Sequence, residues 1–195
     1  MTAMTVSPKT SRRDRWADWS VIVLVAAALL LGVWLRQSAL YRAEDFTIGD
    51  AGLSGRVFTG WVRQTGTDPL MSARNPLSGS FNTVLELRSR ALAAEADPAM
   101  VLDALVLERA TAVDAYKTLA TDQVVVHGEM AVQRTFTYVV VDHNPYVDRL
   151  PEVVRGVDVA LRDEGRVIVV TYLAGNETFD ADYRYFRTFV EDLRW

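Results

Sequence analysis

An uninterrupted apolar run near the amino terminus is the strongest hydrophobic feature of the chain. Residues 21–35 (VIVLVAAALLLGVWL) contain no charged or amide side chain. With its aromatic flank, the segment 16–35 would make about 30 Å of helix at roughly 1.5 Å per residue, close to the thickness of a bilayer core. The pattern predicts a transmembrane helix over 16–35. The side chains expected to anchor it are Trp19, Val21, Leu24, Leu31 and Trp34.

The charges around this run predict its orientation. Four basic side chains lie within residues 1–20, whereas only Arg36 and Arg42 follow the run closely. By the positive-inside rule, the amino terminus is expected in the cytoplasm and the rest of the chain on the periplasmic or cell-surface side. The predicted organisation is a cytoplasmic basic segment 1–15, a transmembrane helix 16–35, a juxtamembrane linker 36–45 and an extracytoplasmic domain 46–195.

Two other interpretations of the apolar run stay open. One is a cleaved signal peptide, for which fifteen apolar residues after a basic stretch is a suitable length. Cleavage requires small residues at positions −3 and −1, and the −3 residues behind Ala39 and Ala43 are Gln37 and Tyr41. The other interpretation is a buried helix of a soluble protein.

After residue 45 the apolar pattern alternates between a period of two and a period of three to four, which predicts an α+β domain. A long helix is expected to begin after Asp97, with Pro98 at its first position, and to run through Tyr116 to Leu119. A second helix is expected at the carboxyl terminus, from Phe179 to Leu193. Strands are expected over 46–48, 57–62, 81–87, 123–127, 130–141, 153–161 and 166–173.

The last of these strands indicates how the layers are arranged. Residues 167–173 are apolar or β-branched at almost every position, which is typical of a central strand covered on both faces. In the preceding strand, Asp158 alternates with Val157 and Val159, so part of one face is expected to be exposed. The pattern predicts an antiparallel β-sheet with helices packed on both faces, an α/β/α sandwich preceded by the transmembrane helix.

Charge and composition exclude several kinds of function. The chain of 195 residues has a net charge of −4, and the part from Phe46 onward has 15 basic and 21 acidic residues. A nucleic-acid-binding domain needs a basic face, so we expect no nucleic-acid partner. The absence of cysteine excludes disulfides, thiolate metal sites and a cysteine nucleophile.

Catalytic and metal-binding motifs are not recognisable in the sequence. His127, His143 and Asp142 are weak candidates for a divalent metal, with Glu129 as a further oxygen ligand, if adjacent strands bring them together. The favoured interpretation of both histidines is an ordinary strand-end or turn residue. We therefore expect no cofactor and no enzymatic activity, with a hydrolase as the least favoured alternative.

Two turn-rich segments, 66–80 and 142–151, carry apolar side chains that do not fit a core strand. Such side chains form an interaction patch when they cluster, or they fill the ends of a sheet. The candidates for contact with a protein partner are Leu70, Met71, Pro76, Tyr146 and Leu150.

Residues 46–195 carry a series of short sequence features in a fixed order. These are Gly60-Trp61, Tyr116, Phe136-Thr137-Tyr138, Gly156-Val157-Asp158, the hairpin 164–169 and the closing helix with Phe179, Phe186, Phe189, Leu193 and Trp195. With these features, the order of elements resembles the PsbP-like family, named for the extrinsic subunit of the photosynthetic oxygen-evolving complex. The resemblance implies this fold and a non-enzymatic bacterial protein, and it carries over no binding residue.

Together these features predict a single-pass, membrane-anchored accessory or assembly subunit. It would contact the lipid bilayer through its amino-terminal helix and bind a protein partner of a membrane or cell-surface complex. The alternative is an exported sensor or carrier domain that binds a small ligand or ion. Co-purification of a stoichiometric protein companion distinguishes the first hypothesis from the second.

Overall fold

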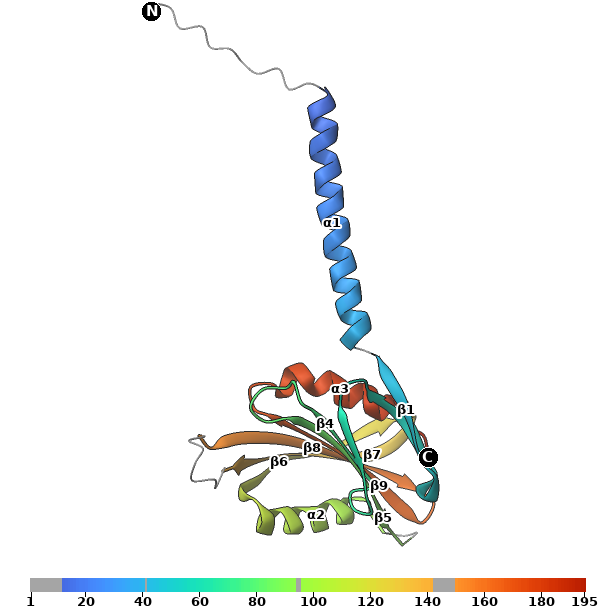
Figure 1. The fold of residues 1–195 in the computed structure, drawn as a ribbon. Coiled ribbons are helices and arrows are strands. Elements are labelled where there is room, and N and C mark those ends of the chain that lie inside the picture. The colour runs from blue at the N-terminus through green and yellow to red at the C-terminus, as the bar shows by residue number, and fades with distance from the viewer. Residues whose placement is uncertain (1–11, 41, 94–95, 142–149) are drawn as a thin grey trace, which may run out of the picture. The chain divides into compact units, whose positions relative to one another are not determined.

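A computed structural model describes residues 12–40, 42–93, 96–141 and 150–195 of the chain. It divides into two compact units, Met1–Arg42 and Ala43–Trp195. Within the first unit, residues Arg12–Leu40 form the helix α1 (Figure 1). The side chains of residues 19–35 on this helix, including the five proposed as anchors, are exposed.

The prediction of a transmembrane helix is wrong. Among the helices that the structure describes, none has the length and apolar character needed to cross a membrane. The physical reason is that the apolar run 21–35 makes only about 22 Å of helix at about 1.5 Å per residue, less than the about 30 Å of a bilayer core. The predicted location, a single-pass membrane protein with an extracytoplasmic domain, is therefore not supported either.

The second unit is built around a seven-stranded antiparallel sheet in the order β3-β4-β5-β9-β8-β7-β6. A separate pair of strands, β1 (Ala43–Ile48) and β2 (Leu53–Phe58), precedes it, with a short 3₁₀ turn at Gly49–Ala51 between them. The sheet strands are β3 (Val62–Thr65), β4 (Met71–Asn75), β5 (Thr83–Ala91), β6 (Asp114–Val126), β7 (Glu129–Val140), β8 (Glu152–Asp163) and β9 (Arg166–Gly175).

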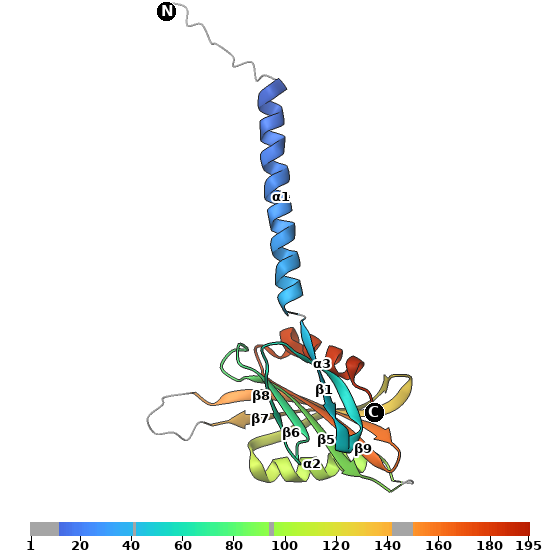
Figure 2. The same ribbon diagram turned by 45° about the vertical axis from the view of Figure 1, so that its right-hand side comes forward.

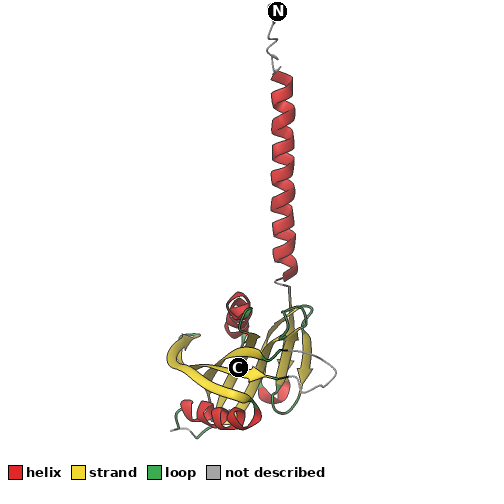
Figure 3. Ribbon diagram, turned by 90° about the vertical axis from the view of Figure 1, so that its left-hand side faces the viewer, coloured by secondary structure: helices red, strands yellow, loops and turns green. Residues whose placement is uncertain are grey.

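Two helices complete this unit, α2 (Ala99–Ala112) and α3 (Phe179–Asp192). They lie on opposite sides of the sheet, as Figures 1 and 2 both show. Strand is nevertheless the commonest element of the described structure, which has three α-helices, as the yellow ribbon of Figure 3 makes clear. The predicted fold class, a helix-covered sandwich behind a transmembrane helix, is corrected accordingly.

The largest difference in secondary structure lies between residues 112 and 122. The helix predicted to reach Leu119 ends at Ala112, and Val113 is already extended, with φ −130° and ψ 156°. Tyr116 and Leu119 lie in β6 instead. The residues after Val113 pair with β7. They include Tyr116, two threonines and three valines, which favour strands over helices. The strands predicted over 130–141, 153–161 and 166–173 and the terminal helix are confirmed.

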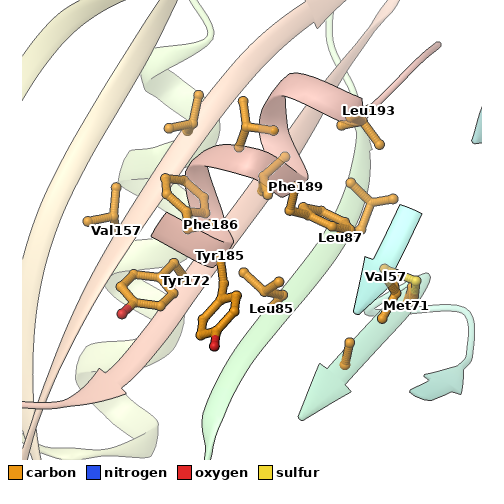
Figure 4. Close-up of a cluster of buried hydrophobic side chains, with 14 of the residues drawn as sticks. Val57, Met71, Leu85, Leu87, Val157, Tyr172, Tyr185, Phe186, Phe189 and Leu193 are labelled. Atoms are coloured by element: carbon orange, nitrogen blue, oxygen red, sulfur yellow. The ribbon is translucent and has the colours of Figure 1, made fainter. Parts of the chain in front are cut away.

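The larger hydrophobic core lies between α3 and the sheet (Figure 4). Phe186 and Phe189 of α3 point toward the sheet, and the Tyr172 ring stacks on Phe186 with 5.5 Å between centroids. The Tyr172 hydroxyl donates a hydrogen bond of 2.7 Å to the carbonyl oxygen of Phe179. Tight aromatic packing therefore fixes α3 on the central strand β9.

A smaller core lies on the opposite face, beneath α2. Val101, Leu102 and Leu105 of the helix pack on Ala160 of β8 and on two valines of β9. This contact covers only the part of the face where β8 ends and β9 begins. The remainder of the same face is not covered by α2.

Candidate functional site

The uncovered part of the sheet face forms a hollow of about 520 Å³. Its lining comes from β4, β5, β7, β8 and β9 and from residues next to the ends of β5, β7 and β8. We call this region the open sheet end. Its lining residues are Arg74, Ser80, Phe81, Asn82, Val84, Glu86, Tyr138, Val140, Val141, Leu150, Glu152 and Leu173.

Aromatic packing forms the floor next to α2. The Phe136 ring is completely buried and lies between Tyr116 and Tyr138, with ring centroids 5.4 and 6.4 Å away. It can lie flat on β8 because residue 156 is glycine. A Cβ atom at Gly156 would lie 2.3 Å from the Phe136 ring, well inside van der Waals contact.

A buried ion pair separates this aromatic floor from α2. The Arg109 guanidinium donates hydrogen bonds to both carboxylate oxygens of Asp158 and lies 4.4 Å above the Phe136 ring. Thr171 donates a hydrogen bond of 2.6 Å to the same carboxylate. Burial acts to lower the pKa of Arg109, but the charge and hydrogen bonds of Asp158 outweigh it, so the pKa is raised. The arginine is therefore a fixed cation that ties α2 to β8.

Two polar groups of the open sheet end are paired with each other. The Ser80 hydroxyl donates a hydrogen bond of 2.7 Å to Glu152, which joins the segment before β5 to the start of β8. Glu86 forms an ion pair of 3.0 Å with Arg88. Burial raises the pKa of Tyr138 to about 12, so its phenol stays neutral to a higher pH than that of an ordinary tyrosine. The arrangement offers hydrogen-bonding groups and apolar contact.

Two leucines stand out beside this hollow because they are almost fully exposed, Leu77 at 90% and Leu150 at 87%. Leu77 lies in the loop between β4 and β5, next to the exposed Pro76, and Leu150 directly precedes β8. Leu150 also lines the hollow. The structure thus brings two of the sequence-predicted partner residues, Pro76 and Leu150, to the same end of the sheet.

The other candidates for partner contact lie elsewhere. Met71 is fully buried in β4 and belongs to the core under α3, and Leu70 is partly buried against the same core. Tyr146 lies outside the described residues, as do Asp142 and His143 of the metal hypothesis.

His127 lies in the turn between β6 and β7, beside α3. Its Nε2 atom is 3.1 Å from the carbonyl oxygen of Val190, and its ring meets Trp195 edge-on at 5.4 Å. Across the ranges that the structure describes, no three acidic or histidine side chains are close enough together to hold a metal ion. Hydrogen bonding and aromatic packing therefore account for the contacts of His127.

The sequence did not reveal the ion pair of this region. Leu77 belongs to the apolar side chains noted in the turn-rich segment 66–80, although it is not among the five candidate partner residues. Asp158 was expected to be exposed, because it alternates with Val157 and Val159, yet it is 1% exposed. Its partner Arg109 is 49 positions away in the sequence and gave no local signal.

No protein-family model and no curated protein sequence matches the chain. Solved structures with the same fold do exist. Cyanobacterial PsbP from Synechocystis sp. PCC 6803 matches with a TM-score of 0.58 at 11% identity, over 80% of this chain and 92% of the other. The Ran-binding protein Mog1p of Saccharomyces cerevisiae matches with a TM-score of 0.52 at 10% identity, over 78% of this chain and 95% of the other.

A third protein of the same fold is LpqN of Mycobacterium tuberculosis, which is involved in cell envelope biogenesis. It gives a TM-score of 0.51 at 13% identity, over 78% of this chain and 90% of the other. These likenesses define a PsbP-like fold, which confirms the resemblance noted in the sequence. At these identities they establish the fold and nothing finer.

Proposed function

We propose that the domain is a non-catalytic binding module that contacts a protein partner through the open sheet end. The observation that carries the proposal is a pair of almost fully exposed leucines at one end of the sheet: Leu150, which lines a hollow of about 520 Å³, and Leu77, which lies in the loop between β4 and β5. Solvent-facing leucines that gather at one site are typical of an interface rather than of an ordinary surface.

The energetics of the site support a protein partner. Complete burial of a leucine side chain contributes about 1.5–3 kcal/mol, so the two leucines together can supply about 3–6 kcal/mol of gross binding energy. Two polar groups at this end of the sheet, Ser80 and Glu152, are already paired with each other. An apolar centre with a polar rim is the usual composition of a protein interface.

The fold neighbours support the same class of function. One of them is described as a Ran-binding protein and another is PsbP. An accessory role, in which this chain assembles with another protein and performs no chemistry itself, would be similar to that of the Ran-binding neighbour. We propose that accessory role for this chain.

The test is co-purification from the source organism with matched surface variants. Leu77→Asp combined with Leu150→Asp is expected to abolish recovery of a stoichiometric companion. The control is Leu107→Asp, because Leu107 is also highly exposed, at 72%, but lies on α2 away from the hollow. A companion that is retained equally by all three proteins would refute the proposed surface.

A second candidate function is the binding of a small ligand in the same hollow. Its volume falls within the range of about 300–1,000 Å³ that is usual for ligand sites. The Tyr138 phenol, Glu86 and Arg74 would supply the polar contacts. Native mass spectrometry of the purified protein distinguishes the two functions. A small molecule that is retained by the wild type and lost from the variant Leu173→Trp, whose larger side chain would fill the hollow, would favour ligand binding.

A further inference from the structure

Strand β6 is a long free edge of the seven-stranded sheet. The two edge strands are β6, with 13 residues, and β3, with four. Long edge strands expose unpaired backbone groups and invite pairing with another chain, so proteins usually blunt them. The short β3 follows that rule, whereas β6 follows it over only half of its length.

The first half of β6 is irregular. Its register against β7 shifts between Asp114 and Lys117 and again between Thr118 and Ala120. Such bulges disrupt an edge and hinder further pairing. From residue 120 to residue 126 the pairing is regular, and the only charged side chain is Asp122. We call residues 120–126 the edge segment.

The turn after the edge segment determines which backbone groups face outward. His127 and Gly128 form a two-residue turn with φ values of 53° and 85°, closed by the pair Val126 and Glu129. In such a hairpin the closing pair is hydrogen-bonded, and hydrogen-bonded pairs then alternate along the strands. The backbone N–H and C=O groups of residues 121, 123 and 125 therefore point away from β7.

These outward groups are accessible. Thr121, Gln123 and Val125 are all exposed, and in the described part of the chain no strand pairs with this side of β6. Three residues with free donors and acceptors at alternate positions are what an added strand requires.

A mainly apolar groove of about 280 Å³ runs beside the edge segment on the α3 side. Val124 and Val126 of β6 and Tyr183, Phe186 and Val190 of α3 line it. Arg187 and Glu191 of α3, which form an ion pair with each other, line it as well. Alternate side chains of a strand added to β6 would face this side of the sheet, next to the two valines. The edge therefore offers side-chain contacts as well as backbone hydrogen bonds.

We propose that the edge segment binds an extended segment of a partner protein by antiparallel strand addition. The bound segment carries small or β-branched apolar side chains opposite Val124 and Val126 and a lysine or arginine opposite Asp122. This surface is separate from the open sheet end, so the inference does not depend on the function proposed above.

Charge complementarity favours such a partner over a second copy of this chain. In an antiparallel pair of two copies, the outward residues 121, 123 and 125 of one copy must face those of the other. Registers confined to the edge segment then place Asp122 opposite Ala120, Asp122, Val124 or Val126 of the second copy. Each of these registers leaves the Asp122 carboxylate without a cation opposite it. Lys117 could face Asp122 only in a register that runs through the irregularity between Thr118 and Ala120. A partner strand with its own basic residue meets no such obstacle.

The test uses the ¹⁵N-labelled protein and two capped peptides, Val-Thr-Val-Thr-Lys-Thr-Thr and the same sequence with Glu in place of Lys. Antiparallel pairing places the fifth peptide residue opposite Asp122. The Lys peptide is expected to shift the amide signals of Thr121, Gln123 and Val125 and to slow their hydrogen exchange. The Glu peptide is expected to bind several-fold more weakly.

Two variants separate strand addition from other binding. Gln123→Pro removes an outward N–H that β7 does not use, and proline is tolerated at such edge positions. Gln123→Pro is expected to lower the affinity for the Lys peptide at least fivefold. The control Gln123→Ala keeps the N–H, so its affinity for the Lys peptide should stay within twofold of that of the wild type. Asp122→Lys is expected to bind the Glu peptide more tightly than the Lys peptide, the reverse of the wild type. This variant tests strand addition even if the proline variant unfolds.

Three results would overturn the proposal. The first is the absence of any amide shift at millimolar peptide. The second is binding that ignores both the proline and the charge reversal. The third is a wild-type dimer that becomes monomeric on Gln123→Pro, since the occupant of the edge would then be a second copy of the chain.

Discussion

Replacement of Arg109 by methionine tests whether the buried ion pair holds α2 on the sheet. Methionine keeps most of the length and apolar volume of the arginine side chain but removes its charge. The Asp158 carboxylate, which is 1% exposed, would keep only the hydrogen bond from Thr171. An uncompensated buried charge is the expected result.

The magnitude follows from that burial. Removal of one partner of a buried ion pair typically costs about 3–5 kcal/mol, because the other charge stays desolvated. We expect Arg109→Met to lower the free energy of unfolding by about 3 kcal/mol or more. The double variant Arg109→Met, Asp158→Leu removes both charges and should recover more than half of the loss, as replacement of a whole buried pair is often nearly neutral.

The assay is equilibrium unfolding in urea, monitored by circular dichroism. The matched control is Arg187→Met, because Arg187 pairs with Glu191 on the surface of α3 at 3.8 Å, where both side chains are largely exposed. Such a helix pair contributes about 0.3–0.5 kcal/mol. Equal destabilisation by the two substitutions, or no rescue in the double variant, would refute the idea that desolvation of Asp158 governs this contact.

Three further predictions concern packing and protonation. Gly156→Ala should destabilise by about 1–3 kcal/mol in urea unfolding, because its Cβ would overlap Phe136, whereas Gly49→Ala, with open space around its Cβ, should have little effect. Phe186→Ala should cost about 3–5 kcal/mol, and a smaller loss in the same assay would mean that α3 can repack. The pKa of Tyr138 is raised from an ordinary 10 to about 12, so this phenol stabilises the folded state fully below pH 10 and loses that contribution as the pH rises toward 12. The melting temperature should therefore fall between pH 10 and pH 12. The variant Tyr138→Phe should show a smaller fall.

Elements with a strong local pattern were predictable from the sequence. The terminal helix repeats its aromatic residues at helical spacing, and the strands over 130–141 and 166–173 are rich in β-branched side chains. The limit of the preceding helix was not predictable in the same way. Apolar residues at positions 112, 116 and 119 continue a helical spacing into β6, and only tertiary pairing with β7 makes that stretch a strand.

The candidate site was predictable only in part. Pro76 and Leu150 were recognised because turn-rich segments cannot bury apolar side chains within a strand. The same reasoning selected Met71, which is buried because it is the first residue of β4 and pairs with Leu87. The position of a strand boundary, which depends on long-range pairing, therefore decides whether an apolar residue near a loop is core or surface.

The early end of α2 connects both proposed binding surfaces. Had the helix continued to Leu119, it would have been about 10 Å longer, at about 1.5 Å per residue. The turn at Val113 instead places Tyr116 in a strand, where its ring stacks on Phe136 beside the hollow. The same turn starts β6, whose regular half is the free edge. One change of backbone direction thus leaves the sheet face uncovered and supplies an edge, and the pairing of the residues after 113 with β7 is its physical cause.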